Sequence, residues 1–198
     1  MIDLQPHPAR QPRHSRKAKN TNAPIEPSPP VWPLPTLNGC APSVIEGEAR
    51  MPGLDLAYLC DPNDATKGHE MPRFVPAFAV ADGEIMYAGK QAHGYALVIN
   101  HNNGWATYYT NLEHMFAVAR SVRPRSRPER VKAGDVIGYV GAPNEGEPRC
   151  LHFELWKLDE ESHFGPADAR EHLGKWLQLP WTDERFNPGD AAVLPIAA

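Results

Sequence analysis

Residues 150–156, CLHFELW, place three chemically capable side chains on one side of a short segment. Cys150, His152 and Glu154 alternate with apolar residues, and this period of two predicts a strand with one apolar face and one chemical face. A thiol beside an imidazole suits three roles: metal ligation, a thiolate nucleophile, or a cysteine that only fills space. The pattern alone leaves all three open for Cys150.

The segments that must position this strand are themselves short strands separated by turn signals. Residues 78–89 alternate around Asp82-Gly83, and residues 131–141 form a further apolar run bounded by glycines. Residues 95–112 contain two apolar runs joined by Asn102-Asn103-Gly104, a strong hairpin signal because Asn and Gly tolerate positive φ. We therefore expect a mainly β protein, built as a small antiparallel sheet or sandwich.

Only one segment has a helical pattern, and it lies near the end of the chain. Residues 168–179, DAREHLGKWLQL, predict a short helix with Asp168 as its N-cap. We accordingly divide the chain into a proline-rich basic arm (1–31), a β-domain (32–160), and a C-terminal helix with an irregular tail (161–198).

The arm differs from the rest of the chain in composition and charge. The 198 residues include 22 prolines, roughly twice the usual share of about 5%. The arm carries many of these prolines, few large apolar residues and a basic cluster, so alone it is expected to be disordered and, when docked, extended. The sequence has a net charge of −4 overall, with the arm near +3 and the remainder near −7. We expect the arm to meet acidic surface, and to bind other protein subunits. The cluster consists of Arg10, Arg13, Arg16, Lys17 and Lys19.

The same numbers argue against several classes of partner and location. The negative net charge gives no general attraction to nucleic acid. No apolar run approaches the ~20 residues of a membrane span, and residues 1–20 lack the apolar core of a secretory signal. We therefore predict a protein made in the cytoplasm, which could leave it by assembly and lysis. An arginine-rich stretch, 120–130, reads either as a solvated loop or as an anion-binding patch.

Four stretches, in order, resemble the lysostaphin-like, or LytM-type, zinc metallopeptidases that cleave peptidoglycan cross-bridges. The resemblance covers residues 32–156 and implies a small antiparallel β-domain with an open groove. The stretches are WPLP (32–35), MPGLDLA (51–57), TYYTNL (107–112), and VKAGDVIGYVG (131–141) followed by CLHFE (150–154).

In the family that this chain resembles, zinc is held by His and Asp of a His-x-Gly-x-Asp motif and by the second His of His-x-His. Two further histidines handle protons. Carried over to this chain, the zinc aspartate is Asp55 and the second zinc histidine is His152. The first zinc histidine is replaced by Met51, and the two proton-handling histidines by Asn111 and Cys150. Three of five positions are therefore substituted.

Such a site is poorly suited to catalysis. Asp55 and His152 are two remnant ligands, whereas a catalytic zinc site uses three protein ligands and keeps one open position. A methionine thioether suits soft copper(I) better than zinc, and an asparagine cannot exchange a proton near neutral pH. We expect no cofactor, with zinc as the alternative if Cys150 completes a ligand set.

Histidines outside the matched motifs are weaker candidates. His69 and Cys60, in the polar stretch 60–74, could add a ligand, although a loop histidine is more often solvated. His93 and His114 match no catalytic position, and His101 is expected to order the hairpin turn.

These features predict a member of the family whose active site is degenerate, and they favour a non-enzymatic role. We expect Asp55, Asn111, Cys150 and His152 to line a groove that serves a structural or interaction subunit, in a virion, a phage-tail-like particle or another cell-envelope-penetrating assembly. One alternative is a non-catalytic peptidoglycan-binding or regulatory module. A second is an active zinc metalloendopeptidase that cleaves peptidoglycan cross-bridges.

Overall fold

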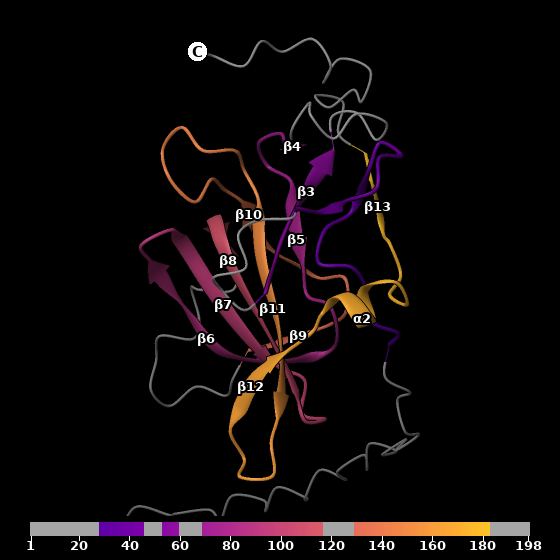
Figure 1. Ribbon diagram of the computed structural model, residues 1–198, viewed down its shortest axis with the longest axis vertical. Coiled ribbons are helices and arrows are strands. Elements are labelled where there is room, and N and C mark those ends of the chain that lie inside the picture. The colour runs from indigo at the N-terminus through magenta and orange to yellow at the C-terminus, as the bar shows by residue number, and fades with distance from the viewer. Residues whose placement is uncertain (1–27, 46–52, 60–68, 117–128, 183–198) are drawn as a thin grey trace, which may run out of the picture.

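The computed structural model describes residues 28–45, 53–59, 69–116 and 129–182, which form mainly short antiparallel strands (Figure 1). The helical element within these ranges is one short helix, α2 (Arg170–Leu173). No helix in the described ranges is long and apolar enough to cross a membrane. The strands are β1 (Thr36–Leu37), β2 (Ser43–Ile45), β3 (Leu54–Leu59), β4 (His69–Glu70), β5 (Pro76–Phe78), β6 (Gly83–Gln91), β7 (Gly94–Asn100), β8 (Trp105–Met115), β9 (Arg130–Val131), β10 (Val136–Val140), β11 (Leu151–Leu158), β12 (Phe164–Ala167) and β13 (Pro180–Trp181).

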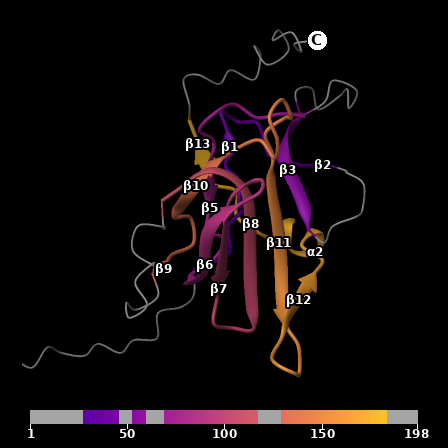
Figure 2. The ribbon, with the colours of Figure 1, turned by 90° about the vertical axis from the view of Figure 1, so that its left-hand side faces the viewer.

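The main sheet has the strand order β2-β3-β11-β8-β7-β6-β9, and every pairing along it is antiparallel. The long strands β8 and β11 lie side by side through its centre (Figure 2). In the register of these strands, His152 lies opposite Asp55 on one side and Thr110 on the other. The predicted antiparallel β fold is therefore confirmed, and it brings two distant motifs into direct contact.

The hairpin predicted at Asn102-Asn103-Gly104 joins β7 to β8. Asn102 and Gly104 adopt positive φ angles of 57° and 84°, as the turn residues require. The second turn signal, Asp82-Gly83, acts differently: β5 and β6 flank it but do not pair with each other, because β5 pairs with β10 and β6 with β7 and β9.

A buried chain of hydrogen bonds ties this hairpin to the loop before β6. The backbone N–H of Val80 donates to the Tyr109 hydroxyl at 3.0 Å, and the hydroxyls of Tyr109 and Thr107 are 3.1 Å apart. His101 contacts Thr107 Oγ1 through Nε2 at 2.9 Å and the Asp82 carbonyl through Nδ1 at 3.0 Å. Because a carbonyl only accepts, Nδ1 carries the proton, and burial lowers the pKa of His101 so that the ring is neutral. The His101 side chain therefore ties the hairpin to the loop before β6. Neither contact is to a residue of the turn 102–104, so its predicted role in ordering that turn stays a prediction.

The residues before β1 pack against the segment after β12, so the two ends of the described chain meet. Val31 is only 4% exposed and forms a bridge with Leu177. The Trp32 indole N–H donates to the Leu173 carbonyl at 2.8 Å. Further along, β1 pairs with β13 in parallel. The packed domain thus already includes Val31.

The helix predicted over 168–179 is much shorter than expected. It covers four residues, Arg170–Leu173, and Ala169 rather than Asp168 occupies the N-cap position, although the Asp168 carboxylate accepts the Arg170 N–H at 2.9 Å. Beyond Gly174 the chain pairs instead with the N-terminal segment: Leu177 N–H donates to the Pro30 carbonyl at 2.9 Å. These tertiary pairings outweigh the local helical preference.

Several expectations lie outside the described residues and stay predictions. They concern the arm up to residue 27, Met51, Cys60 and most of the arginine-rich stretch. The side chain of His69 is likewise not described.

Candidate functional site

A groove of about 720 Å³ opens over β3, β8 and β11, with residues 166–170 forming one wall. Its size is within the range of small-ligand sites in proteins. The four residues predicted to line a groove, Asp55, Asn111, Cys150 and His152, all contribute to it. The sequence motifs that carry them lie up to 97 positions apart and are united by the pairing of β11 with its two neighbours.

Strand β11 alternates between core and groove as its sequence pattern predicts. Leu151, Phe153 and Leu155 are at most 4% exposed, whereas His152 and Glu154 line the groove. The alternation fixes which side chains face the groove, because a shift of one residue would bury the polar set.

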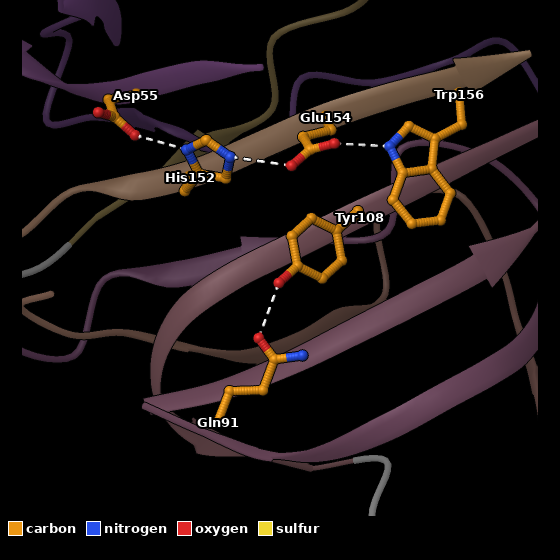
Figure 3. A network of polar contacts seen from close by, with 6 residues as sticks. All are labelled: Asp55, Gln91, Tyr108, His152, Glu154 and Trp156. Atoms are coloured by element: carbon orange, nitrogen blue, oxygen red, sulfur yellow. Dashed lines mark hydrogen bonds and ion pairs between the residues drawn. The ribbon is translucent and has the colours of Figure 1, made fainter. Parts of the chain in front are cut away.

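His152 lies between two carboxylates and uses both ring nitrogens (Figure 3). Its Nδ1 is 2.9 Å from Asp55 Oδ1, and its Nε2 is 3.1 Å from Glu154 Oε1. Hydrogen bonds to Asp55 and to Glu154 raise the pKa of His152 to about 9, against the opposing effect of burial. At neutral pH the ring is therefore an imidazolium that donates from both nitrogens.

The network continues along the same face of β11. The second oxygen of Glu154, Oε2, accepts the Trp156 indole N–H at 2.6 Å. The Trp156 ring stacks on Tyr108 with ring centroids 5.6 Å apart, and the Tyr108 hydroxyl donates to Gln91 Oε1 at 2.9 Å (Figure 3). The five active-site positions carried over from the family do not include Gln91, Tyr108, Glu154 or Trp156. The period of two that selects His152 also places Glu154 and Trp156 on the groove face.

Cys150 and Asn111 form a separate, buried pair beside this network. They are 8% and 5% exposed, and Asn111 Nδ2 donates to Cys150 Sγ at 3.6 Å. Burial, helped by the negative charge of Asp55, raises the pKa of Cys150 to about 11. The thiol is therefore protonated near neutral pH, which does not fit the nucleophile role. Packing against Asn111 fits the space-filling role.

The backbone conformation and the packing at position 53 require the glycine of the stretch MPGLD. Its φ is +115°, and a Cβ at this position would lie 2.7 Å from Glu154 Cγ and 2.9 Å from the Phe153 carbonyl oxygen. Only glycine lets β3 begin this close to β11. The motif thus positions Asp55 whether or not a metal is involved.

The described residues do not fit a zinc site. Within the part of the chain that the structure describes, no group of three His, Cys, Asp or Glu side chains is placed to hold a metal ion. Each ring nitrogen of His152 contacts a carboxylate, Nδ1 that of Asp55 and Nε2 that of Glu154, so a metal ion at this ring would have to displace one of these contacts. Among the remaining histidines, Nδ1 of His93 contacts the Pro143 carbonyl at 3.0 Å and His114 is exposed.

Comparison with known proteins places this geometry in context. Residues 68–166, half of the chain, match the model described as Peptidase family M23. Cell division protein DipM of Caulobacter vibrioides is 36% identical over 86 residues, which are 42% of this chain and 13% of that protein. Murein hydrolase activator NlpD of Salmonella dublin is 29% identical over 138 residues, which are 69% of this chain and 30% of that protein.

The chain therefore spans less than a third of the length of these two relatives. The fold is shared with a crystal structure from Ruminococcus gnavus described as a glycyl-glycine endopeptidase lytM. The two agree with a TM-score of 0.53 at 18% identity, over 77% of this chain and 63% of the other.

Proposed function

This chain belongs to peptidase family M23, and from that premise we propose that it is a non-catalytic member that acts as an interaction or regulatory module. Its groove binds a segment of a partner protein without cleaving it. The observation that carries the proposal is the engagement of His152 by Asp55 and Glu154, at 2.9 and 3.1 Å.

Peptide hydrolysis of this kind needs an activated water and groups that move protons. A zinc-bound water supplies the first, and histidines ordinarily supply the second. In this groove both ring nitrogens of His152 are engaged by carboxylates, and a metal ion would have to displace one of them. Asn111 and the protonated thiol of Cys150 stand where the family resemblance places proton-handling histidines. These substitutions support binding without turnover.

The regulatory role is favoured by one of the relatives. That relative is a murein hydrolase activator and shares 138 aligned residues with this chain. We propose that this chain likewise acts on a cell-wall enzyme by binding it. Incorporation into a virion or another envelope-penetrating particle is a narrower form of the same proposal, in which the bound partner is a structural subunit.

Two measurements separate this function from an active peptidase. Purified full-length protein is analysed for zinc by mass spectrometry and incubated with peptidoglycan, alone and with a purified cell-wall hydrolase. We expect substoichiometric zinc, no soluble fragments from the protein alone, and altered fragment release when the hydrolase is present. Zinc-dependent release by the protein alone, lost in His152→Ala, would contradict the proposal.

The groove itself is tested with a blocking substitution and a matched control. Thr110 lines the groove, whereas Glu160 is exposed at the tip of the β11–β12 hairpin. Thr110→Arg should abolish the effect on the hydrolase, and Glu160→Arg should leave it unchanged. Equal effects of the two substitutions would place the interaction elsewhere on the domain.

A further inference from the structure

Three aromatic side chains form a row on the surface where β10 pairs with β5 and with the end of β8. The Tyr139 ring contacts Phe74 and Phe116 edge to face, with ring centroids 5.8 and 4.9 Å apart. Phe116 is 51% exposed and Phe74 is 36% exposed, and none of the three is among the described residues that line the groove. We call these three residues the aromatic row. A contiguous exposed apolar surface of this kind commonly marks an interaction site.

The aromatic row has a positively charged end and a strained backbone. Arg73 places its guanidinium 5.6 Å from the centre of the Phe74 ring. Phe74 itself has a φ of +66°, an unfavourable conformation for a bulky residue and one that is often found at binding sites. In the sequence, residues 117–128, directly after Phe116, add four arginines and no acidic residue. The surface therefore suits an apolar ligand that carries negative charge.

The described chain ends on the same face of the sheet as the aromatic row. Val75 and Ala77 belong to the core, so the alternating side chains of Pro76 and Phe78 face away from it. Tyr139 is the register partner of Pro76 and shares that face.

Trp181, next to the last described residue, packs against Phe78 with ring centroids 6.2 Å apart. The step from Phe78 back to Pro76, opposite Tyr139, is only about 7 Å along the strand. The chain therefore leaves the described domain next to the aromatic row.

Residues 183–198, which follow the described chain, have the composition that this surface favours. They contain three acidic residues, at 183, 184 and 190, against the single arginine Arg185. Residues 193–196 are the apolar run Val-Leu-Pro-Ile, and proline-containing apolar segments bind well to aromatic side chains. Ten residues separate Thr182 from Val193. Extended, they span up to about 35 Å, which is more than enough to reach the row.

We propose that residues 190–196 dock on the aromatic row of the same chain. Val193, Leu194 and Ile196 pack against the rings, and Asp190 faces the guanidinium of Arg73. The covalent connection supports this contact, because it gives the segment a roughly millimolar effective concentration at the row. This inference goes beyond the proposed function: it identifies a second interaction surface, outside the groove, and the segment that covers it.

The test is photochemical cross-linking from the aromatic row in the full-length protein. Phe116 is replaced by p-benzoylphenylalanine, which on irradiation forms bonds to C–H groups that touch it, and the links are mapped by mass spectrometry. The matched control carries the same amino acid in place of Leu158, which is 37% exposed on the β11–β12 hairpin. A mixture of ¹⁴N- and ¹⁵N-labelled protein distinguishes links within a chain from links between copies.

We expect links from position 116 to residues 190–196 within single chains, and few links to these residues from position 158. Leu194→Ser combined with Ile196→Ser should lower the yield from position 116 roughly threefold or more, because it removes most of the apolar surface that docking would bury. Equal yields from the two positions, links made only between copies, or no link from position 116 to residues 190–196 would each overturn the proposal. The assay contains no partner, so its outcome is independent of the proposed function.

Discussion

The imidazolium of His152 predicts a specific dependence of stability on pH. The two carboxylates raise its pKa from 6.5 to about 9 in the folded chain. Below pH 6.5 the ring is protonated in both the folded and the unfolded chain, and the full stabilisation is present. It is lost as the pH rises through about 9, because the folded chain must then release a proton that it binds more tightly.

The magnitude follows from the pKa and from the exposure of the partners. A pKa raised from 6.5 to about 9 corresponds to roughly 3 kcal/mol of preferential proton binding. The His152 side chain is 14% exposed, but the carboxylate of Asp55 is 42% exposed, and water screens that pair. We therefore expect about 1–3 kcal/mol of stability to depend on protonation of His152.

The measurement is the free energy of unfolding in urea, from pH 6 to pH 9.5, for the wild type and for His152→Gln. The difference between the two proteins should shrink by about 1–3 kcal/mol over this range. His93→Gln is the matched control: it removes another groove histidine, whose Nδ1 contacts the Pro143 carbonyl rather than a carboxylate. Parallel profiles for wild type and His152→Gln would refute the assignment of an imidazolium.

Three further predictions concern groups around the site. Cys150 should react with iodoacetamide at pH 8 more than about tenfold slower in the folded than in the urea-unfolded protein, because its thiol is buried and protonated; similar rates would contradict this. His101→Ala should lower the free energy of unfolding by about 1–3 kcal/mol, since it leaves Thr107 and the Asp82 carbonyl without their partner. Gly53→Ala should destabilise the domain by about 1–3 kcal/mol, because φ is +115° and the new Cβ would meet Glu154. The control Gly165→Ala has open space around the new Cβ and should destabilise the domain less. Equal losses of stability for the two variants in thermal melting would argue against strain at Gly53.

Local patterns in the sequence predict the central strands well, because the turn residues and the alternation of apolar residues that define these strands lie within each segment. The turn at Asn102-Asn103-Gly104 needs positive φ, and the sequence supplies residues that tolerate it. The alternation in residues 150–156 separates core from groove, as β11 does in the structure. A family resemblance was still needed to bring Asp55 and Asn111 to the same groove, since the register between strands is a long-range property.

The misjudged features depend on contacts that no local pattern contains. Residues 174–179 have helix-compatible apolar spacing, yet the chain turns at 174–176, and residues 177–179 pair with backbone groups of Pro30, Trp32 and Thr36. The pairing of His152 with Glu154 is another example. Both residues are visible on one face of the strand, but only the structure shows that one carboxylate joins the imidazole to the Trp156 indole.

The parallel pairing of β1 with β13 has a mechanical consequence. Four backbone hydrogen bonds connect residues 30–38 with residues 177–181: Leu177 to Pro30, Trp32 to Leu177, Thr36 to Leu179, and Asn38 to Trp181. Tension between the segments that flank the described chain would pull β1 toward its N-terminal end and β13 toward its C-terminal end. The two strands would be drawn along each other in opposite directions, so these bonds would be loaded in shear, together rather than one after another. Resistance to such a pull is governed by the unfolding rate rather than by equilibrium stability. Because the four bonds would have to break together, this geometry is expected to slow the unfolding of the domain when force is applied to its two ends.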